Sequence, residues 1–516
     1  MKKGIISLCL FFYFFSSHAQ TYDIKDFGAI ADGKTVNTFF IQKTIDECAN
    51  KGGGTVEVPA GIFITGTFSL KSNVNLHLDN GAVLKGSPDL KDYKSYEMPG
   101  YGINYYGILY TRGVENVSIT GMGTINGNDT VFFEWDKAKK IDSTDTRFTR
   151  QKNNFRKVES GIGDGPVVPK DRPHQMVIFS QCKNVQVRNI SLVHSPLWTL
   201  HFADCDAVLV NDIRLWSGML VPNADGIDVT SCSNVTISDC DIRTGDDAIA
   251  ITGYNHHFEI PGFSGIRKTC ENILVSNCNL QSSSSGIRIG FLDQNTVRNI
   301  HVDNVNITNS TRGIGIFLRD EGSLENITFS NMYIETKLRT GDWWGNGEPI
   351  HISAIRGKEN VKLGQIKNVL FNHIICKGEN GILVYGTDES IINNVEFNDI
   401  TFDLVNSKLN AVAGGNIDLR GVMGVQNGLF KSDIPGLLAK DVKNLVIHNF
   451  KLNWIDPQMP YFTDGIEVEN FNGLKVTDFT GTGAPNNPNA YPVEVKNGKH
   501  FVTDLSKKSV HEVNVK

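Results

Sequence analysis

A short phrase of alternating residues recurs along most of the chain. It begins with Asn, continues as apolar, any residue, apolar, and then keeps alternating, which is typical of a β-strand with one buried face. Asn272, Asn299 and Asn326 start three copies at intervals of 27 residues. Ala207 starts a copy without the Asn, and the other copies start at Asn116, Asn184, Asn234, Asn368, Asn394 and Asn444.

Short strands that recur at one period predict a solenoid. One coil cannot bury its apolar face alone, so successive coils must stack and form ladders of apolar side chains. Asn suits the bends, because its amide can bond to copies above and below. We therefore expect an all-β chain folded as a right-handed parallel β-helix, with the handedness that parallel crossovers prefer. A β-sandwich, the alternative, would place turns every ~8 to 12 residues and would not explain one repeating phrase.

The remaining segments fit a single domain built on this helix. Residues 38–50 have the spacing of a short amphipathic helix, which we expect to cap the first coil. Residues 140–170 read as a long surface loop, and residues 455–516 as a terminal cap or edge strands. No linker rich in Pro, Gly or Ser marks a second domain. Residues 20–516 are therefore predicted to be one catalytic β-helix with loop insertions and a C-terminal extension.

The N-terminus predicts export. Lys2 and Lys3 precede an apolar run over residues 5–15 that is too short to span a bilayer, and Ser17-His18-Ala19 resembles a cleavage site. We expect residues 1–19 to be a signal peptide and the protein to be periplasmic or extracellular, without a membrane span. The formal charge of −6 argues against nucleic acid or an anionic membrane as partner.

Cysteine spacing gives no metal site. Cys9 lies in the predicted signal, and the eight cysteines that follow contain no C-x-x-C pair, so a zinc site is not expected. Cys240 and Cys278 occupy matching positions of successive repeats. We expect these two to stack as small buried residues and not to form a bridge.

Two acidic motifs carry the candidate chemistry. They are Asn223-Ala224-Asp225 and Gly245-Asp246-Asp247, and Asp225 lies 21 residues before Asp246, close to one coil. Stacking would gather the three carboxylates on one face, although like charges at close range resist joint ionisation. Paired carboxylates on a rigid surface are what glycoside hydrolysis requires. Turn preference explains an isolated Asp-Gly, but not a doubled Asp one coil later.

These motifs belong to an ordered set that is similar to a known family. The set opens with Asp26-Phe27-Gly28-Ala29, continues with the turn at residues 121–127 and with Arg172-Pro173-His174, and includes the segment 195–201 before the acidic motifs. Over residues 22–450 the chain resembles the polygalacturonase family, family 28 of the glycoside hydrolases.

The resemblance implies an inverting hydrolase of α-linked galacturonic acid in pectins. It makes Asp246 the general acid, and it makes Asp225 and Asp247 the residues that hold and activate water. It also implies that Asn223 orients its neighbours, that His201 lines the cleft and that neither metal nor cofactor is required. The neighbouring carboxylates are expected to raise the pKa of Asp246 and keep it protonated.

The chain departs from the family where the substrate carboxylate is usually gripped. Ser285 takes the place of the His in a Gly-His-Gly motif, and Gly315 and Phe317 take the places of an Arg and a Lys. The sugar beside the scissile bond is therefore neutral, or its carboxylate is held differently. Arg288 and Arg319 are the candidates for holding it, since Arg binds carboxylates through two parallel hydrogen bonds; the alternative is that both are exposed strand-edge charges.

Two insertions bear on the substrate. Trp343 and Trp344 lie in a polar loop and are predicted to form a cleft wall, because aromatic faces suit sugar rings. Residues 253–259 follow the Asp-Asp turn directly and could close one end of the cleft, which would favour attack at chain ends. Exo action and a rhamnogalacturonan substrate therefore both stay open.

Two other classes of function remain as alternatives. A polysaccharide lyase on this architecture would use Ca²⁺ and a basic residue, and the acidic trio could bind Ca²⁺; the sequence places no evident base beside Asp246. A non-catalytic carbohydrate-binding β-helix would gain nothing from three crowded carboxylates that face an often anionic sugar.

Overall fold

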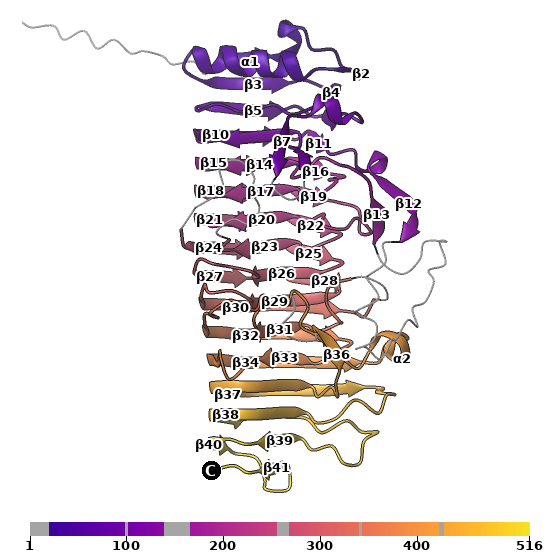
Figure 1. The fold of residues 1–516 in the computed structure, drawn as a ribbon, viewed down its shortest axis with the longest axis vertical. Coiled ribbons are helices and arrows are strands. Elements are labelled where there is room, and N and C mark those ends of the chain that lie inside the picture. The colour runs from indigo at the N-terminus through magenta and orange to yellow at the C-terminus, as the bar shows by residue number, and fades with distance from the viewer. Residues whose placement is uncertain (1–19, 99–101, 139–165, 255–267, 340–342, 423–427) are drawn as a thin grey trace, which may run out of the picture.

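The computed structural model describes residues 20–98, 102–138, 166–254, 268–339, 343–422 and 428–516. The chain forms one column of stacked coils, with its C-terminus at the end opposite the first helix (Figure 1). Within the described residues, 35 strands join in one sheet by parallel pairs. The predicted parallel β-helix is confirmed. Residues 1–19 and most of the predicted 140–170 loop lie outside the described residues.

A typical coil contributes one short strand to each of three sheets, visited in the order sheet 1, sheet 2, sheet 3. Sheet 1 contains β9 (Leu109–Arg112), β14 (Val177–Ser180), β17 (Leu200–Ala203), β20 (Ile227–Thr230), β23 (Ile249–Thr252), β26 (Ser285–Gly290), β29 (Arg312–Leu318), β31 (Ile350–Ala354), β33 (Ile382–Tyr385), β39 (Val493–Lys496) and β41 (Val510–Val513). Sheet 2 contains β1 (Thr21–Asp23), β3 (Gly54–Val58), β5 (Val74–Leu78), β10 (Glu115–Gly121), β15 (Lys183–Arg188), β18 (Asp206–Asn211), β21 (Ser233–Ser238), β24 (Cys270–Ser276), β27 (Val297–Asp303) and β40 (Lys499–Thr503). Sheet 3 contains β2 (Asp32–Val36), β4 (Gly61–Thr65), β6 (Ala82–Gly86), β11 (Thr124–Asn126), β16 (Ser191–Val193), β19 (Arg214–Trp216), β22 (Asp241–Thr244), β25 (Asn279–Ser282) and β28 (Asn306–Ser310).

Towards the C-terminus the bends between sheets straighten into long strands. These strands are β30 (Leu324–Thr336), β32 (Ile366–Gly378), β34 (Ile392–Val405), β37 (Leu437–Ile455) and β38 (Ile466–Thr477). β30 pairs with both β27 and β28, so it serves sheet 2 and sheet 3 at once. Residues 455–516 extend the column through β38 to β41, with β41 as the final strand of sheet 1.

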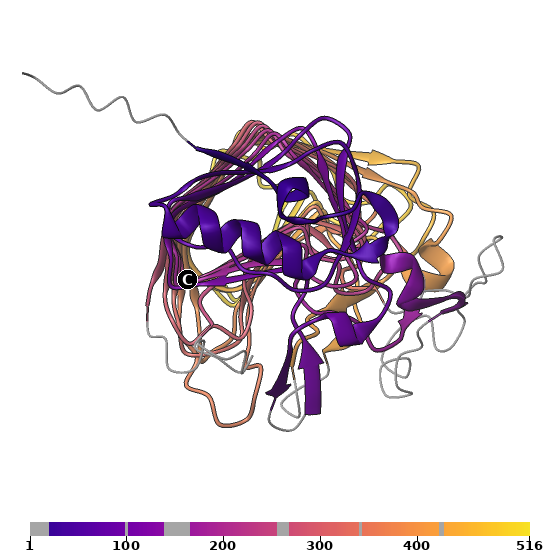
Figure 2. The ribbon, with the colours of Figure 1, turned by 90° about the horizontal axis from the view of Figure 1, so that it is seen from above.

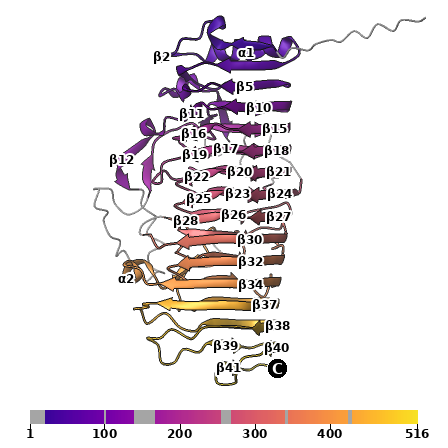
Figure 3. The same cartoon turned by 180° about the vertical axis from the view of Figure 1, so that it is seen from behind.

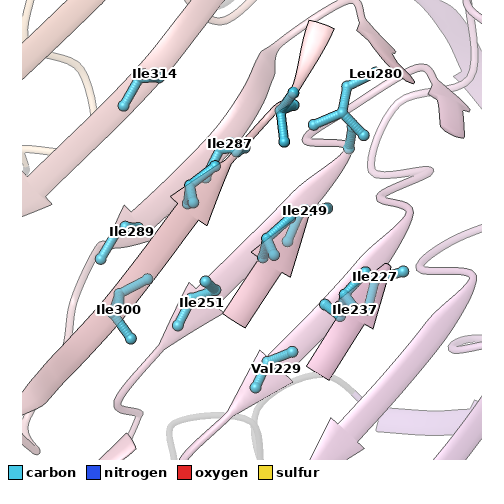
Figure 4. Packing of buried hydrophobic residues seen from close by; sticks show 14 of the residues in the cluster. Ile227, Val229, Ile237, Ile249, Ile251, Leu280, Ile287, Ile289, Ile300 and Ile314 are labelled. Carbon is cyan, nitrogen blue, oxygen red and sulfur yellow. The ribbon is translucent and has the colours of Figure 1, made fainter. Parts of the chain in front are cut away.

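The core is a set of ladders inside the column. Ile227, Ile249, Ile287 and Ile314 occupy one register position of sheet 1 in successive coils, and all four are fully buried (Figure 4). Each coil lies about 4.8 Å from the next, so identical aliphatic side chains meet at van der Waals distance. This regular stacking holds the backbone of sheet 1 in a fixed register. The register in turn fixes where the outward-facing side chains of sheet 1 lie relative to one another.

The repeated asparagines form a second ladder at the bend before sheet 2. Asn299 has a left-handed φ of 57°, which Asn tolerates better than most residues. Its amide donates to Asn272 Oδ1 at 3.1 Å and accepts from Asn326 Nδ2 at 3.2 Å. Equivalent bonds join the repeat from Asn116 to Asn444, with Asp206 bonding to Asn234 where Ala207 interrupts it. The asparagine ladder expected from the sequence is confirmed.

Two substitutions at Asn299 separate the backbone role from the hydrogen bonds. Asn299→Ala should destabilise the protein by about 2 kcal/mol, because it loses the amide bonds and also the side chain that lets Asn tolerate a left-handed φ better than Ala does. Asn299→Gly loses the same bonds but accepts the positive φ, so it should be the more stable variant by about 1 kcal/mol. Chemical denaturation of both proteins measures the difference. Equal destabilisation would contradict a conformational role for Asn.

The first coil is capped as predicted. α1 (Thr38–Asn50) has the expected bounds and lies across the end of the column (Figure 2), where it packs on β1, β3 and β5 through Ile41, Ile45 and Cys48. The 3₁₀ turn η1 (Ile24–Phe27) packs beside it. The eight described cysteines are all buried free thiols, and Cys240 and Cys278 stack without a bridge, as expected.

Most insertions lie between sheet 3 and sheet 1, so they flank the same edge of sheet 1. They form the hairpins and short helices η2 (Leu90–Asp92), β7 (Ser95–Met98), β8 (Gly102–Tyr105), η3 (Asp129–Val131), β12 (Phe133–Ala138), β13 (Val167–Pro169), α2 (Asn410–Ala413), β35 (Asn416–Asp418) and β36 (Leu429–Lys431). β12 and α2 project from the same side of the column in Figure 1 and Figure 3. No helix within the described ranges is both long and apolar enough to cross a membrane.

Candidate active site

The site is built on one register position at the start of the sheet 1 strands. Gly226 N–H donates to the Asp247 carbonyl and Ala248 N–H to the Ser285 carbonyl, both at 2.9 Å, and Ser285 pairs with Arg312. Asp225, Asp247, Ser285 and Arg312 therefore occupy the same place in four successive coils. The parallel register, fixed by the core below, sets their order along the face.

A glycine makes the Asp-Asp turn possible. A Cβ on Gly245 would lie 2.1 Å from the Val221 carbonyl oxygen, so only Gly fits between the two turns. The next two residues, Asp246 and Asp247, then reach outward beside Asp225. One carboxylate oxygen from each of the three lies within 4.8 Å of the others, and all three side chains are buried. The structure thus brings together the trio that the spacing predicts.

The trio lines a cavity of about 180 Å³. One part of its wall is polar and comes from Asn223, Ser284 and Ser285. Another part is aromatic and comes from Trp198, Tyr254, Phe291, Phe317 and Trp344, and three arginines, Arg288, Arg312 and Arg420, complete the lining. A concave site of this kind, with several ring faces beside convergent polar and charged groups, is suited to a sugar.

The three carboxylates have different surroundings. Asp247 accepts hydrogen bonds from Ser284 Oγ at 2.9 Å and Ser285 N–H at 3.0 Å and is ion-paired with Arg288, so a negative charge there is well supported. Burial, and then the charge of Asp247, raise the pKa of Asp246 to about 7. Burial, and then Asp246, also raise the pKa of Asp225 well above its usual range. Asp225 and Asp246 therefore keep their protons to higher pH than ordinary aspartates, and a neighbouring carboxylate raises the proton affinity of each.

Arg288 supplies the positive charge inside the trio. Its guanidinium contacts Asp247 and lies 3.9 Å from Asp225 Oδ2. Burial lowers the pKa of Arg288, but Asp247, Tyr254 and Asp225 outweigh it and raise that pKa well above the usual value. The interpretation that no basic residue lies beside Asp246 is corrected by this arrangement, because Arg288 contacts the other two carboxylates of the trio. Arg288 stays protonated and cannot act as the base of a lyase.

Four predicted substrate-binding residues line the cavity. Asn223 donates its backbone N–H to Asp246 Oδ2 at 3.2 Å, which fits the expected orienting role. Ser285 presents its backbone N–H to Asp247, while its hydroxyl has no hydrogen-bond partner among the described residues. Arg288 pairs with the trio, and Trp344 forms part of the wall, 40% exposed. Their roles towards substrate stay predictions.

Three other predicted residues do not reach the cavity lining. His201 is buried beneath Trp198, packs edge-to-face on it and shares a 3.0 Å hydrogen bond with Thr230. Trp343 is buried, 6% exposed, with the Arg339 guanidinium over its ring. Arg319 is fully buried, which corrects both its assignment as a grip and the alternative of an exposed charge. Of the insertion over residues 253–259, Tyr254 lines the cavity and residues 255–259 lie outside the described residues.

Arg319 holds a loop instead. Its guanidinium donates to the carbonyls of Leu318 and Ser353 at 3.0 Å, to Ser353 Oγ at 2.9 Å and to the Leu419 carbonyl at 3.5 Å. Leu419 and Ile417 also pack on Ile355 and Leu383, outside the main core. These contacts fix the segment between β34 and β37, called here the 406–436 insertion, against the outer face of sheet 1.

The 406–436 insertion contacts the loop between β30 and β31 that contains Trp343 and Trp344, called here the tryptophan loop. Gly345 N–H donates to Asp418 Oδ2 at 3.1 Å, and Arg420 bonds to both Asp418 and the Trp343 carbonyl. A Cβ on Gly421 would lie 2.1 Å from the Phe291 ring, so the insertion also touches the opposite wall. The described residues of the insertion and of the tryptophan loop therefore form a wall of the cavity, to which Trp344 and Arg420 contribute.

Sequence reasoning missed Arg312 and Arg420. Arg312 could have been found by continuing the register of Asp247 for two coils, since Ser285 pairs directly with it. Arg420 lies in an insertion with no counterpart in the repeat, and nothing in the sequence pattern points to it. Phe317 was noted only because it takes the place of a Lys. It lines the cavity, and the Arg312 guanidinium lies 4.8 Å from the centre of the Phe317 ring.

The chain is similar in sequence to known proteins over part of its length. The sequence profile described as Glycosyl hydrolases family 28 matches residues 48–339. A probable polygalacturonase of Vitis vinifera is 29% identical over 262 residues, covering 48% of this chain and 48% of that protein. The alignments with the first three curated relatives cover 48%, 58% and 60% of those proteins, so the chain spans about half of their length.

Solved structures show the same fold. An exopolygalacturonase of Thermotoga maritima has a TM-score of 0.60 at 23% identity, covering 84% of this chain and 92% of that one. A family 28 exopolygalacturonase of Yersinia enterocolitica also has a TM-score of 0.60, at 17% identity, covering 97% of this chain and 78% of that one. Both support the β-helix assignment.

Proposed function

Because this chain belongs to family 28 of the glycosyl hydrolases, we propose that it hydrolyses galacturonic-acid-containing bonds of pectin by an inverting mechanism. The observation that carries the proposal is the cluster of Asp225, Asp246 and Asp247, with oxygens within 4.8 Å of one another in a sugar-sized cavity. The curated relatives, matched over part of their length, have polygalacturonase names.

In the proposed reaction Asp246 donates its proton to the leaving glycosidic oxygen. A pKa of about 7 keeps this carboxyl protonated at mildly acidic pH, as a general acid requires. Asp247, charged and held by Arg288 and two hydrogen bonds, positions a water molecule with Asp225 and removes its proton as it attacks the anomeric carbon. The positive charge of Arg288 lowers the electrostatic cost of keeping Asp247 ionised beside the other two carboxyl groups.

The same geometry supports action at chain ends. The 406–436 insertion is joined to the tryptophan loop through Gly345, Asp418 and Arg420, so the described residues of these two segments form a wall beside the cavity. A polymer could then enter the site only with a terminus towards this wall. We therefore favour exo action, with short products, over random internal cleavage.

We also propose that the protein is exported, because residues 1–19 have the pattern of a secretory signal. Pectic polymers are outside the cell that degrades them, so export and substrate agree. N-terminal sequencing of the mature protein, expected to begin after Ala19, tests this.

Product analysis tests the function directly. The purified protein is incubated with polygalacturonan and with a rhamnogalacturonan in EDTA, and products are identified by mass spectrometry and by proton NMR of the newly formed anomer. We expect saturated mono- or disaccharide products from one polymer, formed first in the inverted configuration. Mixed oligomers would contradict exo action, and a retained anomer would contradict the mechanism. In a parallel incubation with Ca²⁺ in place of EDTA, an unsaturated ultraviolet-absorbing product would replace hydrolase with lyase.

A further inference from the structure

We propose that Arg312 and Arg420 together bind the carboxylate of the sugar next to the scissile bond, in place of the grip that this chain lacks at Gly315 and Phe317. The inference rests on the proposed function, since it names the group of the substrate that the cavity selects. Arg420 comes from the 406–436 insertion and Arg312 from β29, so the recognition element is assembled from two separate parts of the chain.

The distance along the column fits one sugar. Arg312 has the register position of Asp247, two coils further on. With about 4.8 Å between strands, the two residues are about 10 Å apart along the face. A sugar whose glycosidic oxygen lies at the trio would therefore present its next polar groups beside Arg312, in the part of the cavity that Trp344 and Phe317 enclose.

Each arginine is held so that its orientation is fixed before substrate arrives. Arg312 Nε and Nη2 both bond to Glu348 Oε1, at 2.8 and 2.7 Å, and its guanidinium lies over Phe317. Its Nη1 has no hydrogen-bond partner in the part of the chain that the structure describes. Arg420 pairs with Asp418 and lies 5.2 Å from the centre of the Trp344 ring. Guanidinium groups held by an acid on one edge can still bind a carboxylate on another.

The charges around this wall favour an anion. Arg312 and Arg420 are balanced by Glu348 and Asp418. Arg319 adds a third guanidinium that, among the described residues, meets carbonyl and hydroxyl oxygens but no carboxylate. His351, buried against Glu348, adds no further positive charge at neutral pH because burial and then Arg312 lower its pKa to about 4. Among the described residues, the guanidinium groups at this wall therefore outnumber the carboxylates that pair with them, opposite an acidic trio that would repel the same carboxylate.

The test compares an acid with its methyl ester in the same sugar. Oligogalacturonides and their fully methyl-esterified forms differ only in the charge of the groups that the two arginines would bind. We expect the wild type to prefer the acid form. Arg420→Gln is combined with Asp418→Asn, so that no buried carboxylate is left unpaired, and this double variant should lower kcat/KM on the acid form about 10- to 100-fold, mainly through KM. Turnover of the ester should change little, so the preference should collapse.

Matched variants guard against simple misfolding. Arg312→Gln alone would strand Glu348 in the interior, so it is combined with Glu348→Gln, which removes both charges. Arg243→Gln, an exposed arginine on β22 paired with Asp241, serves as control and should leave both substrates unaffected.

The outcomes separate this inference from the proposed function. A wild type that hydrolyses both forms without preferring the acid overturns the carboxylate grip but leaves the hydrolase. Equal losses of kcat/KM on the acid and on the ester in the variants also overturn the carboxylate grip. They would show that the two arginines shape the cavity without binding the carboxylate. A wild type that turns over neither form overturns the proposed function, and the grip with it.

Discussion

Replacing Asp246 with Asn should lower kcat about 10³-fold while leaving the fold intact. General-acid catalysis contributes roughly 10²- to 10⁴-fold, and a carboxamide cannot donate the proton that the leaving oxygen requires. Asn fits the site, because one amide oxygen can still accept the N–H of Asn223 or of Asp247. Steady-state kinetics on the substrate that product analysis identifies gives the number, and circular dichroism checks the fold.

Asp241→Asn is the matched control. It makes the same chemical change on β22, in the same coil, but at a residue that pairs with exposed Arg243 away from the cavity. We expect its kcat to remain within about twofold of wild type, as is usual for surface substitutions. Equal losses in the two variants would show that the effect of Asp246→Asn comes from the coil and not from acid catalysis.

The pH dependence gives a second signature of Asp246. Its folded pKa is raised from 3.8 to about 7, so the proton needed for catalysis is present below that pH and is lost as pH rises through it. The kcat/KM of the wild type should therefore fall above about pH 7. In Asp246→Asn the residual activity should lack this alkaline limb. A limb that persists unchanged would assign it to another group of the coupled trio.

The same shift makes the fold less stable as pH rises. The native state binds the Asp246 proton between the unfolded pKa near 4 and the folded pKa near 7, where the unfolded chain has released it. That contribution to the free energy of unfolding is therefore fully present below about pH 4 and is gone above about pH 7. Asp246→Asn should flatten this part of the stability profile.

The repeat explains why so much of the fold could be predicted. Asn299 and its copies mark one bend of each coil, and in a parallel stack the position of one coil fixes the next. The spacing from Asp225 to Asp246 was therefore enough to place three carboxylates together. The structure refines this placement, because the residue directly in register with Asp225 is Asp247. The direction of the Asp246 pKa shift was also predictable, although burial exceeds the neighbouring charge as its cause.

The rest of the site depends on parts of the chain that do not repeat. Arg420 reaches the cavity only because Ile417 and Leu419 fix an insertion on sheet 1, and no local pattern shows where an insertion will fold back. Trp343 and Trp344 look equivalent in sequence, yet Trp343 is buried beside Arg339 and Trp344 lies at the cavity beside Arg420. The sequence predicted that Arg319 either holds the substrate carboxylate or is an exposed charge. In the structure it is buried and bonds to the carbonyls of Ser353 and Leu419.

Arg288→Met should have the largest effect on stability, and it should also impair catalysis. Removing one partner of a buried ion pair typically costs about 3 to 5 kcal/mol, because the remaining charge is left without compensation. Here Asp247 would lose its contact and Asp225 a guanidinium 3.9 Å away. We expect the midpoint of urea unfolding at pH 7 to fall accordingly, and kcat to fall at least 100-fold.

The matched control is Arg298→Met, which removes an arginine on β27 that pairs with Glu271 at 2.7 Å but is 43% exposed. Surface ion pairs contribute about 0 to 1 kcal/mol, so this variant should be nearly as stable as wild type. Comparable losses in the two variants would contradict a special role for the buried pair.

The pH profile distinguishes loss of charge from loss of packing at position 288. Arg288 lowers the pKa of Asp225 and of Asp246, although burial and the neighbouring carboxylates raise them more. Without it, both carboxyls should hold their protons to higher pH, so the variant should recover stability as pH falls, and the alkaline limb of activity that Asp246 sets should move to higher pH. Arg288→Lys keeps the positive charge but not the paired geometry. It should therefore return the pH limb towards its wild-type position while kcat stays below that of the wild type. A variant whose profile matches wild type, merely scaled down, would show that Arg288 acts by packing alone and that the trio sets its own proton affinities.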